Sequence, residues 1–290
     1  RKAGMPDHKD FPMQFTRLFA SLALSAGITV GLAGCGDKGA PAQTKADAAP
    51  QTVTLKVGVS PVPHADIINF VAPQLEKEGV KVKVIEFNDY VQPNLALAEK
   101  ELDANFFQHK PYLDTFAKEH KLSLAVLCAV HIEPMGVYSK TVKNIADTPE
   151  GAKVGIPNDP TNGGRALKVL ESAGLIKVRP EAGVLATKND ITENPKKLNF
   201  VEVEAAQLPR ALDDVALAVI NSNFALSANL NPVKDAIAIE SKDSPYANIV
   251  AIRAGDENRP ELQKLKAALA TPELRKFLEE KYQGAVVPAF

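Results

Sequence analysis

From residue 53 onward, short apolar stretches that suit β-strands alternate with segments whose apolar residues recur at helical spacing. Residues 53–60 and 80–87 alternate apolar and polar side chains, as strands do. Residues 64–78 between them carry apolar side chains at helical spacing and end at Gly79. A chain in which strands and helices alternate favours an α/β fold. The sequence therefore predicts an α/β protein.

The chain is long enough for two lobes. Its 290 residues suggest about two domains, and a polar segment with turn residues at 139–153 separates two groups of strands and helices. We predict a first lobe from residues 53–138 together with 241–290, and a second lobe from residues 139–240. Open α/β sheets bind ligands beyond the carboxyl ends of their strands. We therefore expect a ligand cleft between the lobes, bordered by the turns that follow the strands.

The first fifty residues have the layout of an exported protein. Residues 1–12 precede Met13, the expected start, and are interpreted as an upstream extension. Residues 13–34 supply a basic residue, an apolar run and a small-residue site, which is typical of a secretory signal peptide. The run ends in LAGC, which resembles the lipobox of bacterial lipoproteins.

The lipobox resemblance implies cleavage before Cys35 and lipidation of its thiol. Residues 35–52 are then expected to form a flexible tether, because a stretch rich in Ala, Lys, Asp, Gln and Pro buries little apolar surface. Stable anchoring takes more than one acyl chain. We therefore expect a protein of the bacterial cell envelope, lipid-anchored to a membrane and facing the periplasm or the exterior.

Composition excludes several classes of function. A net charge of -1 provides no basic stripe for nucleic acid. The two cysteines, Cys35 and Cys128, exclude a disulfide-stapled scaffold. The five histidines form no HExxH or paired i, i+4 pattern, so we expect no metal and no other cofactor. No G-x-S-x-G elbow and no nucleophile paired with a base occur, so we expect no catalytic residues and no enzyme activity.

The string PNDPTNGGRAL, at residues 157–167, stands where a strand leads into a helix. Glycines before a helix favour an anion, because the first N–H groups of the helix lack internal partners. Gly163 and Gly164 are followed by Arg165 and Ala166, which fits neither a P-loop nor a dinucleotide fingerprint. What remains is an arginine in the first helical turn, whose planar fork matches a carboxylate. A surface arginine in a glycine-rich turn is the alternative.

Two other turns carry aromatic or amide side chains. Alternation along ANFFQHKPY sends Asn105, Phe107 and His109 to one face, and Tyr90 at an earlier turn adds another ring. Such an aromatic wall suits a thioether through sulfur–ring contacts, although a core Phe beside a surface His is the alternative. Asn221 follows a buried strand. Its amide suits a zwitterion or, alternatively, caps the next helix.

Several long strings together resemble one protein family. They are NLALAEKELDANFFQHKPYL, IPNDPTNGGRAL, VEVEAAQLPRALDDVALAVINSNFAL, SPYANIV and the ending KYQGAVVPAF, in addition to the lipobox. With them the chain resembles the methionine-binding lipoproteins of bacterial ABC importers, often called the NlpA or MetQ family, from the signal through Phe290. The resemblance implies a two-lobe, type II-like periplasmic substrate-binding-protein fold that closes on free methionine in the cleft between the lobes.

The resemblance also implies roles for four polar residues. Arg165 would hold the α-carboxylate of the ligand, with Asn162 nearby. Asn221 and Asn248 would hold the backbone groups of the amino acid, and Asn248 is assigned on the resemblance alone.

Three further positions match the side-chain pocket of the family, namely Tyr90, Phe107 and His109. The sequence departs from the family in two places. TNGGR has two glycines where other residues are common, and NSN stands where NGN is usual. These departures concern the geometry of two loops.

The implied function is capture of L-methionine or D-methionine and delivery to an ABC importer, which consists of a permease and a cytoplasmic ATPase. The partners are then the amino acid, the importer and a membrane, without nucleic acid. Binding of D-methionine, a methionine derivative or a short peptide stays open as an alternative. A surface lipoprotein that acts through protein contacts is a further one.

Overall fold

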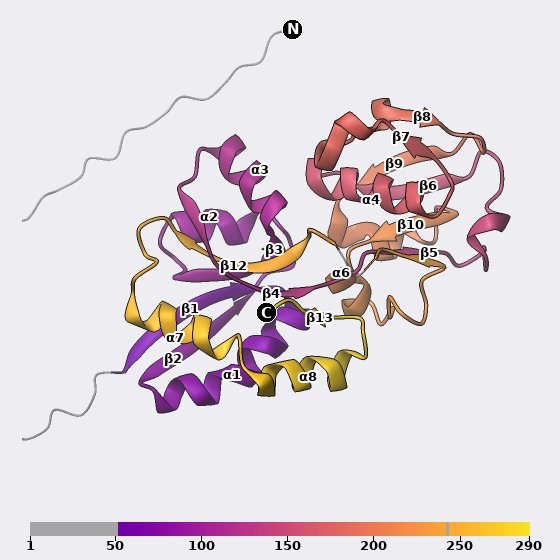
Figure 1. Ribbon diagram of the computed structural model, residues 1–290. Coiled ribbons are helices and arrows are strands. Elements are labelled where there is room, and N and C mark those ends of the chain that lie inside the picture. The colour runs from indigo at the N-terminus through magenta and orange to yellow at the C-terminus, as the bar shows by residue number, and fades with distance from the viewer. Residues whose placement is uncertain (1–51, 242–243) are drawn as a thin grey trace, which may run out of the picture. The chain divides into compact units, whose positions relative to one another are not determined.

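A computed structural model describes residues 52–241 and 244–290, which all belong to one compact unit of the chain (Figure 1). The expected extension, signal peptide and Cys35 lie outside the described residues, as does the tether up to residue 51. The described strands form a six-stranded sheet, a five-stranded sheet and a two-stranded sheet.

The six-stranded sheet is mixed. β1 pairs in parallel with β2 and with β3, whereas β12 runs antiparallel to β3 and β4. The strands lie in the order β13 (Val287–Pro288), β4 (Leu124–Ile132), β12 (Ala247–Arg253), β3 (Ala104–His109), β1 (Val53–Val59) and β2 (Val80–Glu86).

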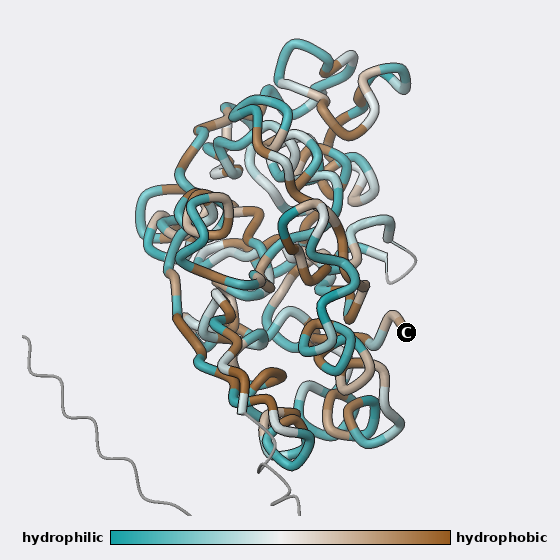
Figure 2. Tube along the Cα trace, turned by 90° about the vertical axis from the view of Figure 1, so that its left-hand side faces the viewer, coloured by the Kyte–Doolittle hydropathy of each residue, from teal (hydrophilic) through white to brown (hydrophobic). Residues whose placement is uncertain are grey.

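Helices cover both faces of this sheet (Figure 1). Val250 and Ile252 of β12 pack in a core with α1 (Asp66–Lys77), α7 (Pro260–Ala268) and α8 (Pro272–Tyr282). The alternate residues Ile249 and Ala251 pack in a second core with α2 (Gln92–Ala98) and α3 (Lys110–His120). Successive side chains of a strand point to opposite faces, so the strand is buried on both sides. Hydrophobic and hydrophilic residues alternate along the helix traces, as helices with one face on a sheet require (Figure 2).

The five-stranded sheet combines parallel and antiparallel pairs. β6 is parallel to β9 and to β10, and β5 is antiparallel to β10 and to β11. Its largest helix, α4 (Pro160–Ser172), packs on β6 around Leu167 and Leu170. The strands lie in the order β11 (Ala238–Ile239), β5 (Gly136–Tyr138), β10 (Leu217–Ile220), β6 (Lys153–Pro157) and β9 (Asn199–Val203).

The remaining elements are short. β7 (Lys177–Val178) and β8 (Ile191–Glu193) form the two-stranded sheet, and α5 (Leu208–Ala211) and α6 (Ser222–Ser227) flank β10. An irregular helical turn, η1 (Pro61–Ala65), precedes α1. The 3₁₀ turns are η2 (Ile145–Asp147), η3 (Pro180–Leu185), η4 (Lys188–Asp190) and η5 (Ala205–Gln207).

The mixed α/β architecture confirms the predicted fold class. Strand β5 differs from the expected division of the chain, because it pairs with β10 and β11 although the sequence placed the second lobe from residue 139 onward. The second sheet therefore begins one strand earlier. Strands β7, β8 and β13 were not expected from the sequence.

Within residues 52–241 and 244–290, no helix has both the length and the apolar character needed to cross a membrane. The apolar run of the expected signal lies before this range.

Candidate functional site

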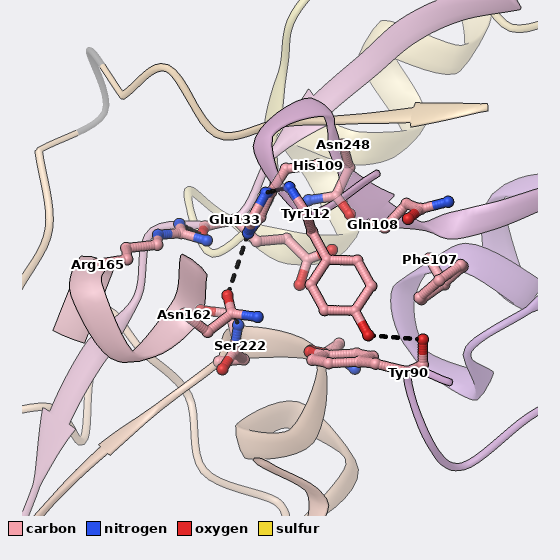
Figure 3. A pocket seen from close by; sticks show the side chains of 12 residues that line it. Tyr90, Phe107, Gln108, His109, Tyr112, Glu133, Asn162, Arg165, Ser222 and Asn248 are labelled. Carbon is pink, nitrogen blue, oxygen red and sulfur yellow. Dashed lines mark hydrogen bonds between the residues drawn. The ribbon is translucent and has the colours of Figure 1, made fainter. Parts of the chain in front are cut away.

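All seven residues that the sequence singled out for ligand binding line one pocket with about 320 Å³ of empty space, the open solvent at its mouth included (Figure 3). The pocket is built from turns and strand ends of both large sheets, where the sequence placed the candidate contacts. The predicted residues are Tyr90, Phe107, His109, Asn162, Arg165, Asn221 and Asn248. Five lining residues were not predicted, namely Gln108, Tyr112, Glu133, Ser222 and Asn223.

A bulge at the end of β3 sets which side chains reach the pocket. Val250 of β12 lies opposite Phe106, but the next residue, Ile249, lies opposite Gln108, so Phe107 is the extra residue. The predicted alternation therefore holds only in part. Phe107 and His109 line the pocket, whereas Asn105 turns to the α2 side of the sheet and donates to the side chain of Asn94 at 2.8 Å.

His109 has a defined proton position. It caps the N-terminus of α3, where its Nδ1 accepts from the backbone N–H of Tyr112 at 3.1 Å, so its proton lies on Nε2. The Nε2–H then donates to Oδ1 of Asn162 at 3.1 Å (Figure 3). Burial lowers the pKa of His109 to about 3, so the ring is neutral at neutral pH.

Asn162 organises its neighbours. Its Oδ1 accepts from His109 and, at 2.9 Å, from Nδ2 of Asn221. Its Nδ2 donates to both carboxylate oxygens of Asp159, at 3.1 and 3.0 Å. Because both ends of the amide are engaged, Asn162 positions His109 and Asn221.

Helix α4 begins earlier than the sequence indicated. Asp159 accepts from the backbone N–H of Asn162 and caps the helix, and Pro160 occupies the first helical position. Gly163 and Gly164 are therefore helical residues, and Arg165 lies beyond the first turn instead of in it. A Cβ on Gly164 would lie 2.5 Å from the carbonyl oxygen of Val184, so the glycine permits close packing of η3 on α4.

The guanidinium of Arg165 is held from several sides. Its Nε donates to Oε1 of Glu240 at 2.9 Å, and its Nη2 donates to Oε2 of the same carboxylate and to the carbonyl oxygen of Glu133 at 2.8 Å. The ring of Tyr246 lies against it, with the guanidinium carbon 4.4 Å from the centroid. The two-nitrogen fork that the sequence assigned to a ligand thus faces Glu240. Nη1 makes no hydrogen bond within the described residues.

Asn221 stands at the N-cap position of α6, but its side chain makes no capping hydrogen bond. Its Nδ2 donates to Asn162, and its Oδ1 is buried without a partner among the described residues. An unsatisfied buried acceptor is costly, and this one lies at the pocket. The capping alternative is therefore not realised, and the ligand-facing role of Asn221 stays a prediction.

Asn248 lies directly opposite His109 in the pairing of β12 with β3. Its Oδ1 is 3.1 Å from Nε2 of His64. The bond leaves the Nδ2 donors of Asn248 for another acceptor, since no hydrogen bond from Nδ2 is formed within the described part of the chain.

Aromatic rings gather at one end of the pocket. The centroid of Tyr90 lies 5.8 Å from that of Phe107 and 5.7 Å from that of Tyr112. The hydroxyl of Tyr112 donates to the carbonyl oxygen of Tyr90 at 2.8 Å (Figure 3), and the hydroxyl of Tyr90 donates to Oδ1 of Asn223 at 2.6 Å. These bonds fix the rings in one wall of the pocket, whose surface suits an apolar or thioether group.

Glu133 is the charged residue that sequence reasoning missed. It follows β4, its side chain is only 4% exposed, and its Oε1 is 2.7 Å from Nε2 of His131 and 3.3 Å from Nε2 of His64. Burial raises the pKa of Glu133 and lowers those of His64 and His131, to about 4 and about 3. The i, i+2 spacing of His131 and Glu133, which puts two side chains on one face of an extended chain, was the signal available in the sequence.

Comparison with known proteins shows the family to which the chain is similar. Residues 55–290 match the model of the NlpA lipoprotein family. The D-methionine-binding lipoprotein MetQ of Salmonella typhimurium is 44% identical over 214 residues, which are 73% of this chain and 79% of that protein.

Solved structures show the same fold. A nutrient binding protein from Burkholderia cenocepacia, bound to methionine, is 50% identical with a TM-score of 0.79 and covers 81% of this chain and 100% of its own. A periplasmic substrate-binding protein of an ABC transporter from Coxiella burnetii is 40% identical with a TM-score of 0.78 and covers 81% of this chain and 100% of its own. The chain therefore has the substrate-binding-protein fold that the sequence predicted.

Proposed function

Because this chain belongs to the NlpA lipoprotein family, we propose that it is a substrate-binding lipoprotein that captures methionine in its pocket and delivers it to an ABC importer. The observation that carries the proposal is the convergence of all seven predicted contacts on one pocket. The methionine bound to the Burkholderia cenocepacia structure and the name of the Salmonella typhimurium relative support the same ligand.

We assign the α-carboxylate of the ligand to Nη1 of Arg165. That nitrogen is the part of the guanidinium that Glu240 leaves unused, and Arg165 lines the pocket. The contact differs from the two-nitrogen clamp expected from the sequence, because Nε and Nη2 are engaged elsewhere. The unpartnered Oδ1 of Asn221 and the Nδ2 of Asn248 then serve the backbone groups of the amino acid.

The ligand side chain is assigned to the space beside Tyr90 and Phe107, with His109 at its edge. Burial of a methionine-sized side chain contributes about 1.5 to 3 kcal/mol, and each sulfur–ring contact adds about 0.3 to 1.5 kcal/mol. Hydrogen bonds to the charged ends of the ligand contribute about 1.5 to 3 kcal/mol each. Together, less the cost of ordering the ligand, these terms allow micromolar or tighter binding.

We propose binding without turnover. A structural relative is a substrate-binding protein of an ABC transporter, and the pocket residues are engaged in orienting one another. The permease, its cytoplasmic ATPase and a membrane anchor at Cys35 complete the proposal, which places the protein in the cell envelope with its pocket toward the periplasm or the exterior.

Isothermal titration of the chain, freed of co-purified ligand, tests the proposal. L-Methionine should bind with one-to-one stoichiometry, and L-norleucine, which has a methylene in place of sulfur, should bind more weakly. Arg165→Ala should abolish the measurable heat of methionine binding while circular dichroism shows a folded chain. An absence of heat with both enantiomers of methionine would refute the proposed function.

D-Methionine is the second candidate, because the Salmonella typhimurium relative is named for it. Titration with D-methionine, methionine sulfoxide and a methionine-containing dipeptide ranks this candidate against the derivatives and short peptides that the sequence left open. A surface role through protein contacts instead predicts no tight ligand in the panel.

A further inference from the structure

Glu133 is a buried carboxylate that none of the contacts assigned above uses. Among the described residues that line the pocket, it is the one carboxylate and Arg165 is the one guanidinium. Figure 3 shows Glu133 among the labelled side chains that surround the pocket. A pocket wall with one acidic and one basic group has the polarity of a zwitterion.

The carboxylate of Glu133 is held by a hydrogen bond from His131, and a second buried histidine, His64, lies beside it and donates to Asn248. Nε2 of His131 lies 2.7 Å from Oε1, and Nε2 of His64 lies 3.3 Å from the same oxygen. The backbone of Asn223 lowers the pKa of this carboxyl group, which favours its charged form. Both imidazoles are fully buried, and His131 and His64 each pack against Phe106, at centroid distances of 5.3 and 4.6 Å. The hydrogen bond from His131 therefore sets the direction in which Glu133 points, and the packed ring of His64 limits the space beside it.

Among residues 52–241 and 244–290, no full positive charge is paired with the carboxylate of Glu133. His64 and His131 are neutral at neutral pH, because burial lowers the pKa of each ring well below its usual range. Arg165 attracts Glu133, yet its guanidinium pairs with the carboxylate of Glu240 and reaches Glu133 only at the backbone carbonyl. A buried carboxylate without a cation is costly, so a ligand cation at this position is stabilised.

The two charged groups also lie close enough for one small ligand. Nη2 of Arg165 donates to the carbonyl oxygen of Glu133 at 2.8 Å, so the guanidinium adjoins the residue that carries the carboxylate. The ammonium and carboxylate of an α-amino acid are attached to the same carbon atom. A pair of neighbouring groups of opposite sign matches that arrangement.

We propose that Glu133, positioned by His131, receives the primary ammonium group of the bound amino acid. This inference rests on the proposed function and narrows it. The pocket takes free amino acids, and it excludes ligands whose amino group is acylated or absent. His131 acts through Glu133 as a positioning residue, whereas His64 orients Asn248.

A metal ion is the competing occupant, since ligand atoms of His64, His131 and Glu133 all lie within 4.8 Å of one another. A histidine that binds a metal usually donates its other ring N–H to a partner. The Nδ1 atoms of both histidines are buried without a partner in the described part of the chain. With the protons on Nε2, by contrast, both rings donate to Glu133 or Asn248. The hydrogen-bonded arrangement is therefore favoured.

The test compares two ligands on two proteins by calorimetric titration. L-Methionine and 4-(methylthio)butanoate share the carboxylate and the thioether, but only the first has an ammonium group. We expect Glu133→Gln to weaken L-methionine binding by about 10- to 100-fold, the range for loss of a hydrogen bond to a charged group. It should change the affinity for 4-(methylthio)butanoate by less than about threefold. Glu101→Gln, at an exposed glutamate, is the matched control and should change neither affinity.

The wild-type chain gives a second readout that needs no variant. It should bind L-methionine at least about 100-fold more tightly than N-acetyl-L-methionine or 4-(methylthio)butanoate. Equal affinity for ligands with and without the ammonium would overturn the inference, as would equal weakening of both ligands by Glu133→Gln.

His131→Phe, which keeps a ring beside Phe106, should weaken L-methionine binding selectively if His131 positions the carboxylate. Stoichiometric metal in the purified wild-type protein, lost in Glu133→Gln, would show that the cluster binds a metal and would also overturn the inference. A wild-type chain that binds no methionine at all contradicts the proposed function instead.

Discussion

Replacing Gly164 by alanine tests why two glycines stand inside α4. A Cβ at this position would lie 2.5 Å from the carbonyl oxygen of Val184, and 3.0 and 3.1 Å from the backbone nitrogen and oxygen of Ala186. Ordinary contacts of a Cβ begin at 3.4 Å, so the new methyl group would lie about 0.9 Å too close to the carbonyl oxygen of Val184 and about 0.3 to 0.4 Å too close to the two atoms of Ala186. The chain after η3 and helix α4 would have to move apart.

Two opposing contributions set the change in stability caused by Gly164→Ala. Overpacking costs about 1 to 3 kcal/mol, with the upper end expected where the obstacles are backbone atoms. Alanine favours the helix by about 0.8 to 1.0 kcal/mol over glycine. We therefore expect Gly164→Ala to lower the free energy of unfolding by about 2 kcal/mol, which corresponds to a fall in Tm of about 4 to 8 °C for a domain of this size.

Urea unfolding followed by circular dichroism measures the change. Ser172→Ala, at an exposed position of the same helix, controls for helix propensity and should shift stability by less than about 0.5 kcal/mol. Because Arg165 follows Gly164 directly, Gly164→Ala should also weaken methionine binding. A variant as stable as the wild type, with unchanged affinity, would refute the packing explanation of this glycine.

The remaining predictions concern buried polar groups. Burial lowers the pKa of His64, His109 and His131 to between about 3 and about 4, whereas the unfolded chain takes up these protons near pH 6.5. The contribution of these neutral histidines to the free energy of unfolding is therefore complete above about pH 6.5 and is lost as the pH falls. For His109 alone, the free energy of unfolding should fall by about 2 kcal/mol between pH 8 and pH 5. Urea unfolding at several pH values checks this, and His109→Gln should have a shallower slope; equal slopes would contradict it. Tyr90→Phe should lower the free energy of unfolding by about 1 to 3 kcal/mol, because Oδ1 of Asn223 loses its hydrogen-bond donor. Unchanged thermal unfolding would show that water replaces the hydroxyl.

The periodic part of the fold was predictable from the sequence. Long strands and helices carry several turns or alternations each, so the α/β class and most element positions follow from local pattern. Strands of two or three residues, such as β7 and β13, have no such pattern, because pairing with distant segments creates them. The membership of β5 in the second sheet is likewise decided by its distant partner β10.

Prediction of the site from the sequence was likewise limited to what local patterns show. Arg165, Asn221 and Phe107 were identified from residue type and from their positions after strands, and the family resemblance added Asn248. The partner of Arg165, Glu240, lies 75 residues away in the chain and could not be inferred locally. Glycine lowers helix propensity, so Gly163 and Gly164 hid the early start of α4 despite the capping aspartate and the proline before them.

A crystal structure of the chain grown with excess L-methionine measures the central claim most directly. We expect the ligand in the pocket of Figure 3, with an oxygen of its carboxylate about 3 Å from Nη1 of Arg165. Its thioether should lie beside the rings of Tyr90 and Phe107. An empty pocket, or a ligand whose carboxylate lies away from Arg165, would contradict methionine binding through this guanidinium.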